Sequence, residues 1–389
     1  MTDVPQIAPF QTDGTVVQYC QTMPGALLAQ GKFEQARAFL AVLAKCAQEG
    51  ALPNHFSEID LASKPAHHPA PVGSPSALAS LWFIQAAYVY YSCQNEPAFW
   101  RQTLLPAMKR LGLSIVGGEF PNLRMDDGGL LESTDTIARP LIVNILWDNA
   151  LSILDEELKA AGDPGCKHFE HLRGRFKRSF LKMFWLDDRN FLLPPAKLIY
   201  AVPPATDAAA PPPSPVSDPA PPSASPSSEA DPAQLLMTVL AFSAVPRTKQ
   251  RLVVDWLKTR RLGIYGLQVD SAASGPACYS PLLLAWLAEG HVRTSDMPAT
   301  TIAEAKTLLQ NCYELLSRTG TLSEFYDAQG QPVGAAPYIP HGPSAAEVYR
   351  VWHGLLQVAE RPLGNSKRSR ITGGLMPTAV NRDPGDRVV

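Results

Sequence analysis

The sequence predicts an all-α fold in which consecutive helix pairs close into a toroid. Helical periodicity covers most of the 389 residues, and the helices come mostly in consecutive pairs. The loops alternate between long and short, and long loops gathered at one end of a toroid would build a concave mouth. A stacked superhelix also fits the periodicity, but no sequence repeat of about 34 or 40 residues supports it.

The first half of the chain contains three predicted helix pairs, at residues 16–29 and 32–49, 76–94 and 96–111, and 139–161 and 166–183. The helix at 76–94, SALASLWFIQAAYVYYSCQ, is apolar nearly all round and is therefore expected to be buried on most sides. The helix at 166–183 has a basic face opposite a row of Phe and Leu residues. This pattern is typical of a solvated outer helix.

The second half begins with a predicted short hairpin at 184–200, whose turn is Asp187–Asn190. Residues 203–231 are almost entirely Pro, Ala and Ser, so they cannot bury enough apolar surface to fold, and we expect a disordered insertion. Helical patterns resume at residues 232–244, 247–259, 279–289, 301–318 and 344–359. Residues 365–389 read as a disordered tail, which leaves a single domain over residues 1–364.

Composition excludes several classes of function. The net charge of -2 gives no basic face for nucleic acid, and no run of about 18 apolar residues predicts a membrane span. The six cysteines are scattered without a CxxC pair, and the first residues lack the pattern of a signal peptide. Both observations favour a reducing, cytoplasmic location. No HxxxH or HExxH motif occurs, so we expect no metal site.

Two acidic stretches are candidates for chemistry. One, directly before the apolar helix at 139–161, contains Asp126, Asp127, Glu132 and Asp135, and the other, GTLSEFYDAQG, contains Glu324. Inverting hydrolysis of a glycosidic bond needs one carboxyl that protonates the leaving oxygen and another that deprotonates the attacking water, about 6.5–9.5 Å apart. Solvated acidic turns look identical in sequence, so the residues alone leave both interpretations open.

Several sequence blocks occur in a fixed order: ASLWFIQA (79–86), RMDD (124–127), RPLIVNILWDNAL (139–151), DPAQLLMTVLAF (231–242), GTLSEFYDAQGQP (320–332) and PSAAEVYRVW (343–352). In order and spacing they resemble the glucosidase domain of bacterial and archaeal glycogen debranching enzymes, the amylo-α-1,6-glucosidases, over about residues 9–356. The resemblance implies an (α/α)6 toroid of the six-hairpin-glycosidase type. It also implies inverting hydrolysis of α-1,6 branch bonds in α-glucans, with no metal or organic cofactor.

The resemblance assigns roles to particular residues. Asp126 occupies the general-acid position and Glu324 the general-base position. Four further residues match retained positions and are expected to bind substrate: Trp82, Asn144, Trp147 and Gln234. The two tryptophans could give a sugar ring an aromatic surface, but tryptophans buried in a helical core would give the same pattern.

Much of the shell that the resemblance assigns to the sugar pocket is replaced. The family's polar or aromatic residues give way here to Val17, Gln18, Leu78, Arg124, Ile142, Asp231, Ala233, Gly275, Pro276, Ser280, His341, Gly342 and Pro343. Each lost partner for a sugar hydroxyl costs about 1–3 kcal/mol, so five or six losses would remove most of the binding of the transition state.

Three hypotheses follow from the retained carboxylates and the replaced shell. The first is a diverged glycoside hydrolase that acts on an α-glucan or related oligosaccharide. The second is a non-catalytic pseudoenzyme that binds glycan or regulates another glycogen-metabolism protein. The third is a scaffold in which Asp126 and Glu324 are only loop residues. If Leu78, Ile142 and Tyr279 filled the mouth of the toroid, the first hypothesis would be weakened.

Overall fold

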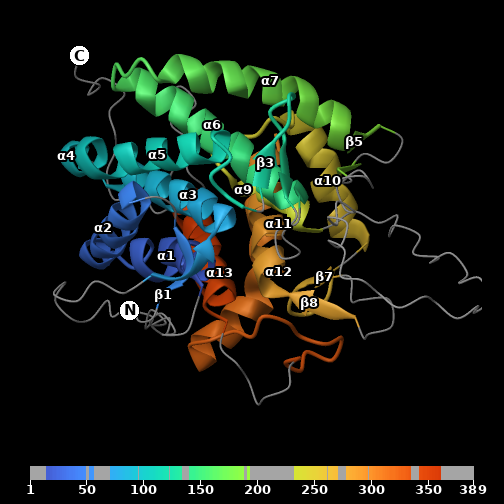
Figure 1. Ribbon diagram of the computed structural model, residues 1–389. Helices are drawn as coiled ribbons and strands as arrows, with labels where there is room; N and C mark the ends of the chain where they lie inside the picture. Colours follow the sequence, from blue (N-terminus) through green and yellow to red (C-terminus); the bar gives the residue numbers. More distant parts are fainter. Residues whose placement is uncertain are drawn as a thin grey trace, which may run out of the picture.

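The computed structural model describes residues 15–49, 52–56, 71–94, 96–121, 123–133, 140–187, 191–192, 232–260, 262–269, 277–296, 298–333 and 341–360. In these ranges the chain forms long helices joined by short two-stranded antiparallel hairpins (Figure 1). The all-α prediction is confirmed. The predicted insertion at 203–231, the predicted tail at 365–389 and Asp135 lie outside the described residues.

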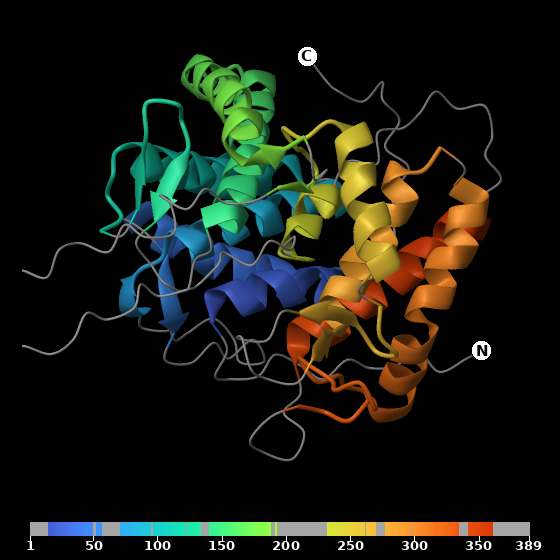
Figure 2. The same ribbon diagram turned by 90° about the vertical axis from the view of Figure 1, so that its right-hand side faces the viewer.

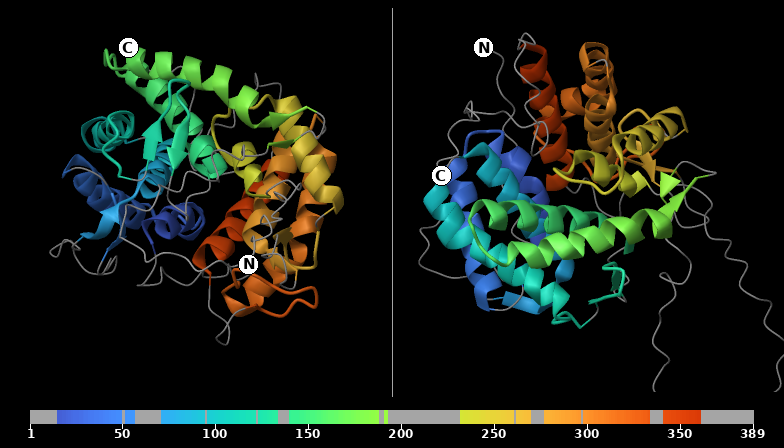
Figure 3. Two further views of the ribbon diagram at one scale, coloured as in Figure 1. Left: turned by 45° about the vertical axis from the view of Figure 1, so that its right-hand side comes forward. Right: turned by 90° about the horizontal axis from the view of Figure 1, so that it is seen from above.

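Six inner helical segments form a closed ring. In ring order they are α1 (Val16–Met23) with its π-helical extension η1 (Pro24–Leu28), α3 (Ala77–Cys93), α6 (Pro140–Ala160), η3 (Pro232–Leu235) with α9 (Leu236–Val239), α11 (Pro281–Thr294) and α13 (Gly342–Glu360). Each segment packs on the next, and α13 packs back on α1. Figures 1 and 3 show this closure, with the red α13 beside the blue α1. A superhelix would keep these two ends apart, so the toroid prediction is confirmed.

Outer helices cover the ring. In the described ranges they are α2 (Phe33–Glu49), α5 (Leu105–Val116) preceded by α4 (Pro97–Phe99) and η2 (Trp100–Leu104), α7 (Cys166–Phe184), α10 (Arg247–Arg260) and α12 (Pro298–Thr319). Figure 2 shows the yellow-to-red helices α10 to α13 on one side of the molecule and the blue-to-green helices α1 to α7 on the other.

Burial differs between inner and outer helices as the sequence predicts. Every residue of α3 from Ala79 to Tyr90 is buried, because α3 has neighbours on all sides. In α7 only the row of Phe169, Leu172, Phe176, Phe180 and Phe184 is buried. The basic side chains Lys167, Lys177, Arg178 and Lys182 are exposed on its opposite face.

Four hairpins connect outer helices to the inner helices that follow them. They are β1 (Pro53–Phe56) with β2 (Pro71–Pro75), β3 (Leu123–Met125) with β4 (Leu131–Ser133), β5 (Trp185–Leu186) with β6 (Phe191–Leu192), and β7 (Leu267–Val269) with β8 (Cys278–Ser280). Successive helices run antiparallel, so all inner helices begin at one end of the ring. We call this end, with the four hairpins and the loop at 320–333, the mouth.

The sequence predicted only the β5–β6 hairpin, because strands of two to five residues show no clear periodicity. Several predicted helices also have different limits. Tyr279 belongs to β8 and not to the helix that follows. The helix predicted at 232–244 ends at Val239, where Leu240 becomes extended. Beyond it, the N–H of Phe242 donates to Asn149 Oδ1 at 3.1 Å and that of Ala244 donates to Asp148 Oδ2.

Local chemistry fixes the seam between the first and last inner helices. Thr15 and Gln18 form a reciprocal capping box at the start of α1, with hydrogen bonds of 3.1 and 2.9 Å. Gly25 in η1 touches α13 so closely that a Cβ atom there would stand 1.9 Å from the carbonyl oxygen of Ala346. Any side chain at this position would therefore push η1 and α13 apart. Among the described residues, no helix is long and apolar enough to cross a membrane.

Candidate active site

Asp126 lies in the turn of the β3–β4 hairpin, at the mouth above α6. Its backbone N–H donates to the carbonyl of Leu130 at 2.8 Å, and its Oδ1 accepts the N–H of Leu130 at 2.7 Å. The carboxylate is half-buried, and one of its oxygens closes its own turn. This bond gives the side chain one orientation relative to the hairpin.

Buried side chains of α6 fix this hairpin from below. Asn144 donates to the carbonyl of Leu131 and accepts from its N–H, both at 2.8 Å. Trp147 Nε1 donates to the carbonyl of Gly129 at 3.2 Å. The turn that carries Asp126 is therefore attached to the start of an inner helix by three hydrogen bonds from side chains.

Glu324 lies in the loop that precedes α13. The N–H of Ser323 donates to the hydroxyl of buried Tyr326 at 3.0 Å, and the N–H of His341 donates to the carbonyl of Leu322 at 2.7 Å. Tyr326 also pairs with Tyr279 of β8 through backbone hydrogen bonds. The Glu324 side chain is exposed, yet the atoms around it desolvate the carboxyl enough to raise its pKa above the ordinary value.

The two carboxylates belong to opposite sides of the ring. Asp126 precedes α6 and Glu324 precedes α13, and these helices stand three places apart in a ring of six. The loops that carry them therefore lie on opposite sides of the mouth by topology, and that the two carboxylates face one another stays a prediction. The separation that inverting hydrolysis requires stays a prediction.

Of the four residues predicted to bind substrate, Trp82 lines a cavity inside the ring and is 7% exposed. Asn144, Trp147 and Gln234 are fully buried. The first two hold the Asp126 hairpin, and Oε1 of Gln234 accepts the N–H of Leu192 in β6 at 3.0 Å. In this structure the three residues position mouth loops, and any contact of theirs with a sugar stays a prediction.

Several of the replaced positions are half-buried, among them Val17, Gln18, Leu78 and Ile142. Leu78 and Ile142 pack partly against the hydrophobic core, and the ring of Tyr279 lies over Gly263, where a Cβ would meet it at 2.2 Å. Gln18 uses its amide in the capping box of α1. These contacts give the replacements structural roles at the rim of the mouth.

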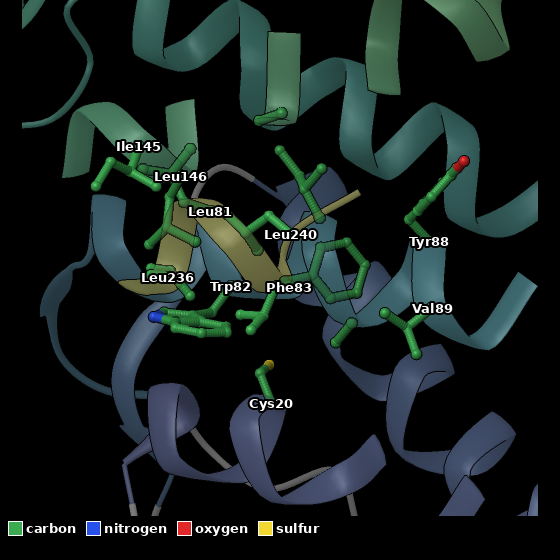
Figure 4. Packing of buried hydrophobic residues seen from close by; sticks show 14 of the residues in the cluster. Cys20, Leu81, Trp82, Phe83, Tyr88, Val89, Ile145, Leu146, Leu236 and Leu240 are labelled. Atoms are coloured by element: carbon green, nitrogen blue, oxygen red, sulfur yellow. The ribbon is translucent and has the colours of Figure 1, made fainter. Parts of the chain in front are cut away.

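A cavity lies inside the ring, and we call it the bore cavity. Its volume is ≈ 40 Å³, with part of the surrounding space open to solvent, which is room for about three water molecules. Its lining comes from five of the six inner segments: Cys20, Gln21, Pro24, Trp82, Gln85, Ala86, Val89, Leu236, Val239, Leu240, Trp286, Glu347 and Arg350. Figure 4 shows part of this wall, with the indole of Trp82 beside Leu236 and near Cys20.

Paired charges border the bore cavity on the side of α11 and α13. Arg350 donates to Glu347 at 2.9 and 2.8 Å and to Glu289 at 2.5 Å, and Arg293 lies 3.5 Å from Glu289. Trp286 Nε1 donates to Glu347 Oε2 at 3.0 Å. Two positive and two negative groups balance, as buried charges require.

Sequence reasoning missed Trp286, Gln85, Glu347 and Arg350 as cavity residues. The available signal was the presence of polar and charged side chains on helices that are otherwise apolar, such as AAEVYRVW at 345–352. Such groups are expensive to bury without partners, so they mark either a paired network or a cavity wall. Within the described ranges, no group of three or more His, Cys, Asp or Glu side chains could hold a metal ion.

Residues 20–139 match a family model described as amylo-alpha-1,6-glucosidase. The resemblance drawn from the sequence is confirmed for this part of the chain. No curated protein matches the sequence.

Solved glycosidase structures share the fold at low sequence identity. A rhamnosidase from Klebsiella oxytoca with rhamnose bound gives a TM-score of 0.54 at 11% identity, over 87% of this chain and 64% of that one. The GH78 rhamnosidase of Bacillus sp. GL1 gives 0.55 at 14% identity, over 87% of this chain and 31% of that one. The chain thus spans less than two thirds of either rhamnosidase.

A third structure matches over nearly its full length. It is an α-mannosidase from Streptococcus pneumoniae, described as metal-independent, in a non-productive complex with α-1,6-mannobiose. It gives a TM-score of 0.57 at 11% identity, over 92% of this chain and 91% of that one. At such identities the likeness shows the fold, which is the helical toroid of the six-hairpin glycosidases.

Proposed function

We propose that this chain is a glycoside hydrolase that cleaves α-1,6 branch bonds at the ends of an α-glucan or related oligosaccharide, with inversion. The observation that carries the proposal is the pair of carboxylates, Asp126 and Glu324, on loops that precede opposite inner helices of a glycosidase-type toroid. The family match over residues 20–139 includes the Asp126 loop and supports the choice of substrate.

In this mechanism Asp126, in its protonated form, donates its proton to the glycosidic oxygen as the bond to the anomeric carbon breaks. Glu324, as a carboxylate, takes a proton from the water that attacks the anomeric carbon from the opposite face. The raised pKa of Glu324 supports the role of base, because a carboxylate with a higher pKa accepts a proton more readily. No cofactor takes part in the scheme.

Glucose release from branched dextrin by the purified full chain tests the proposal. We expect release by the wild type and its loss in Asp126→Asn and Glu324→Gln. The matched control is Asp127→Asn, which removes the exposed neighbouring carboxylate and should keep the rate. Absence of release by the wild type, or equal rates in the wild type and both active-site variants, would reject hydrolysis of this substrate.

A second function is favoured by a different observation. Oδ1 of Asp126 already accepts a backbone hydrogen bond, and apolar residues such as Leu78 and Ile142 stand where sugar-binding groups are expected. Both features fit a non-catalytic relative that binds glycan or acts beside another glycogen-metabolism protein. Co-sedimentation with glycogen that survives both Asp126→Asn and Glu324→Gln, without glucose release, would support this alternative over the hydrolase.

A further inference from the structure

The bore cavity lies deeper in the ring than the replaced positions at the mouth. On α3, Trp82 and Gln85 follow Leu78 by four and seven residues, which corresponds to about 6 and about 10 Å along the helix axis. On α11, Trp286 follows Ser280 by six residues, or about 9 Å. The cavity therefore begins about one to two helical turns inside the mouth.

Two tryptophans reach the cavity from opposite sides. Trp82 is on α3 and Trp286 is on α11, and these helices stand three places apart in the ring. The side chain of Trp286 has a fixed orientation, because its Nε1 donates to Glu347. The two indoles give opposite walls of the cavity an apolar surface, against which the apolar C–H groups at the edge of a sugar ring can pack.

The polar side chains that line the bore cavity, Arg350, Gln85 and Glu347, offer both hydrogen-bond donors and an acceptor. Arg350 uses Nε and Nη2 for its glutamate partners, and Gln85 uses Oε1 to accept from Asn149. Within the described part of the chain, Nη1 of Arg350 and Nε2 of Gln85 make no hydrogen bond, while both side chains line the cavity. Oε1 of Glu347 accepts one bond from Arg350, and a carboxylate oxygen can accept two.

A neutral sugar is the ligand that such a wall fits. The charges of Glu289, Arg293, Glu347 and Arg350 cancel, so neither a cation nor an anion is favoured. A sugar hydroxyl both donates and accepts, which matches one arginine nitrogen, one amide nitrogen and one carboxylate oxygen. The cavity has room for about three waters, and three hydroxyl groups can replace them.

We propose that the bore cavity receives the hydroxyl edge of one neutral sugar unit at the end of an oligosaccharide, held between Trp82 and Trp286 by Arg350, Glu347 and Gln85. Sugar recognition in this chain has thereby moved inward from the replaced shell at the mouth. The inference rests on the proposed function only in taking a sugar as the ligand.

Titration of the full chain with D-glucose, D-mannose and L-rhamnose, followed by saturation-transfer NMR and tryptophan fluorescence, tests the inference. We expect at least one sugar to bind in the millimolar range. Ala86→Leu fills the cavity and should weaken binding by about tenfold or more. Ala303→Leu, which adds the same side chain at an exposed site on α12, should leave binding unchanged.

Because Ala86 is buried, folding of its variant is checked by circular dichroism and thermal midpoint, and Trp82→Phe provides a second, milder change that should also weaken binding. Absence of binding of all three sugars to the wild type, or wild-type affinity in a folded Ala86→Leu, would overturn the inference. Asp126→Asn and Glu324→Gln should keep monosaccharide binding while they abolish hydrolysis. A failure of hydrolysis alone therefore counts against the proposed function, and a failure of binding alone counts against the cavity.

Discussion

The mouth and the bore of the ring differ in what they retain. At the mouth, Leu78 and Ile142 replace polar groups, and the two carboxylates stand on loops. In the bore, Trp82, Trp286 and the Arg350–Glu347 pair form a wall in which charges are balanced and buried. Matched residues such as Asn144 and Gln234 therefore hold the hairpins of the mouth, whereas the open space inside the ring is lined by other side chains.

Asn144, Trp147 and Gln234 illustrate this point. All three match retained positions, and all three are buried with their polar groups bonded to the backbone of a mouth hairpin. Their retention therefore needs no ligand to explain it, because loss of such a side chain leaves buried backbone groups without partners. Residues that contact a sugar must instead be among those that line a cavity or the surface.

The largest expected loss of stability comes from a substitution that releases a hairpin of the mouth. Asn144→Ala removes two hydrogen bonds and leaves the buried N–H and C=O of Leu131 without their side-chain partner. We therefore expect the free energy of unfolding to fall by about 4 kcal/mol. Chemical denaturation measures this loss. Asn311→Ala, at an exposed asparagine of α12, should change it by less than about 0.5 kcal/mol. Equal effects of the two changes would contradict the role given to Asn144.

The next effect concerns a buried carboxyl of α6, which lies beside the backbone of Ala244. Burial raises the pKa of Asp148 to about 6, and its Oδ1 has no hydrogen-bond partner. The folded-state pKa lies above the unfolded value, so ionisation of this group destabilises the fold as pH rises from about 4 to about 6, by about 3 kcal/mol. Asp148→Asn keeps an oxygen for the N–H of Ala244 and cannot ionise.

The stability of Asp148→Asn relative to the wild type should therefore increase across this pH range. Urea denaturation at several pH values from about 4 to about 7, which cover the range in which the group ionises in the two states, measures the difference between the two proteins. A difference that does not change with pH would show that Asp148 is not a buried ionising group.

A smaller effect is expected at the seam that closes the ring. Gly25→Ala would set a Cβ against the backbone of Ala346, so η1 and α13 must separate, at a cost of about 2 kcal/mol. Gly174→Ala, on the outer helix α7, meets only the tip of Arg178 at 3.7 Å and should stabilise by up to about 1 kcal/mol. Thermal midpoints compare the two, and a tolerated Gly25→Ala would mean that the seam is looser than the contact indicates.

The smallest expected effect is a shift in the pH dependence of hydrolysis. Because the base must be ionised, activity should fall as the pH drops through the pKa of Glu324. Desolvation raises this pKa, so the acidic limb of the pH profile should lie at a higher pH than an ordinary glutamate would give. The pH profile of kcat/KM for branched dextrin reports the limb. A limb at or below the usual glutamate range would remove this group from the role of base.

The sequence predicted the long helices and the ring, because 3.6-residue periodicity and the all-round apolar character of α3 are direct consequences of burial. It did not predict where α9 ends, since Asp148 and Asn149 of α6 determine that end from about 90 residues away. Three of the four hairpins were also missed, because their strands are too short for a period. For the site, sequence gave the two carboxylates as candidates and placed them in loops, but the bore cavity depends on which helices are neighbours in the ring.

The configuration of the first sugar released tests the central claim most directly. If Asp126 and Glu324 act across the mouth with a water between them, an α-linked branched dextrin must yield the β-anomer first. Time-resolved proton NMR of the wild-type reaction distinguishes the anomers before they equilibrate. Appearance of the β-anomer first is the predicted result, and appearance of the α-anomer first would contradict the account.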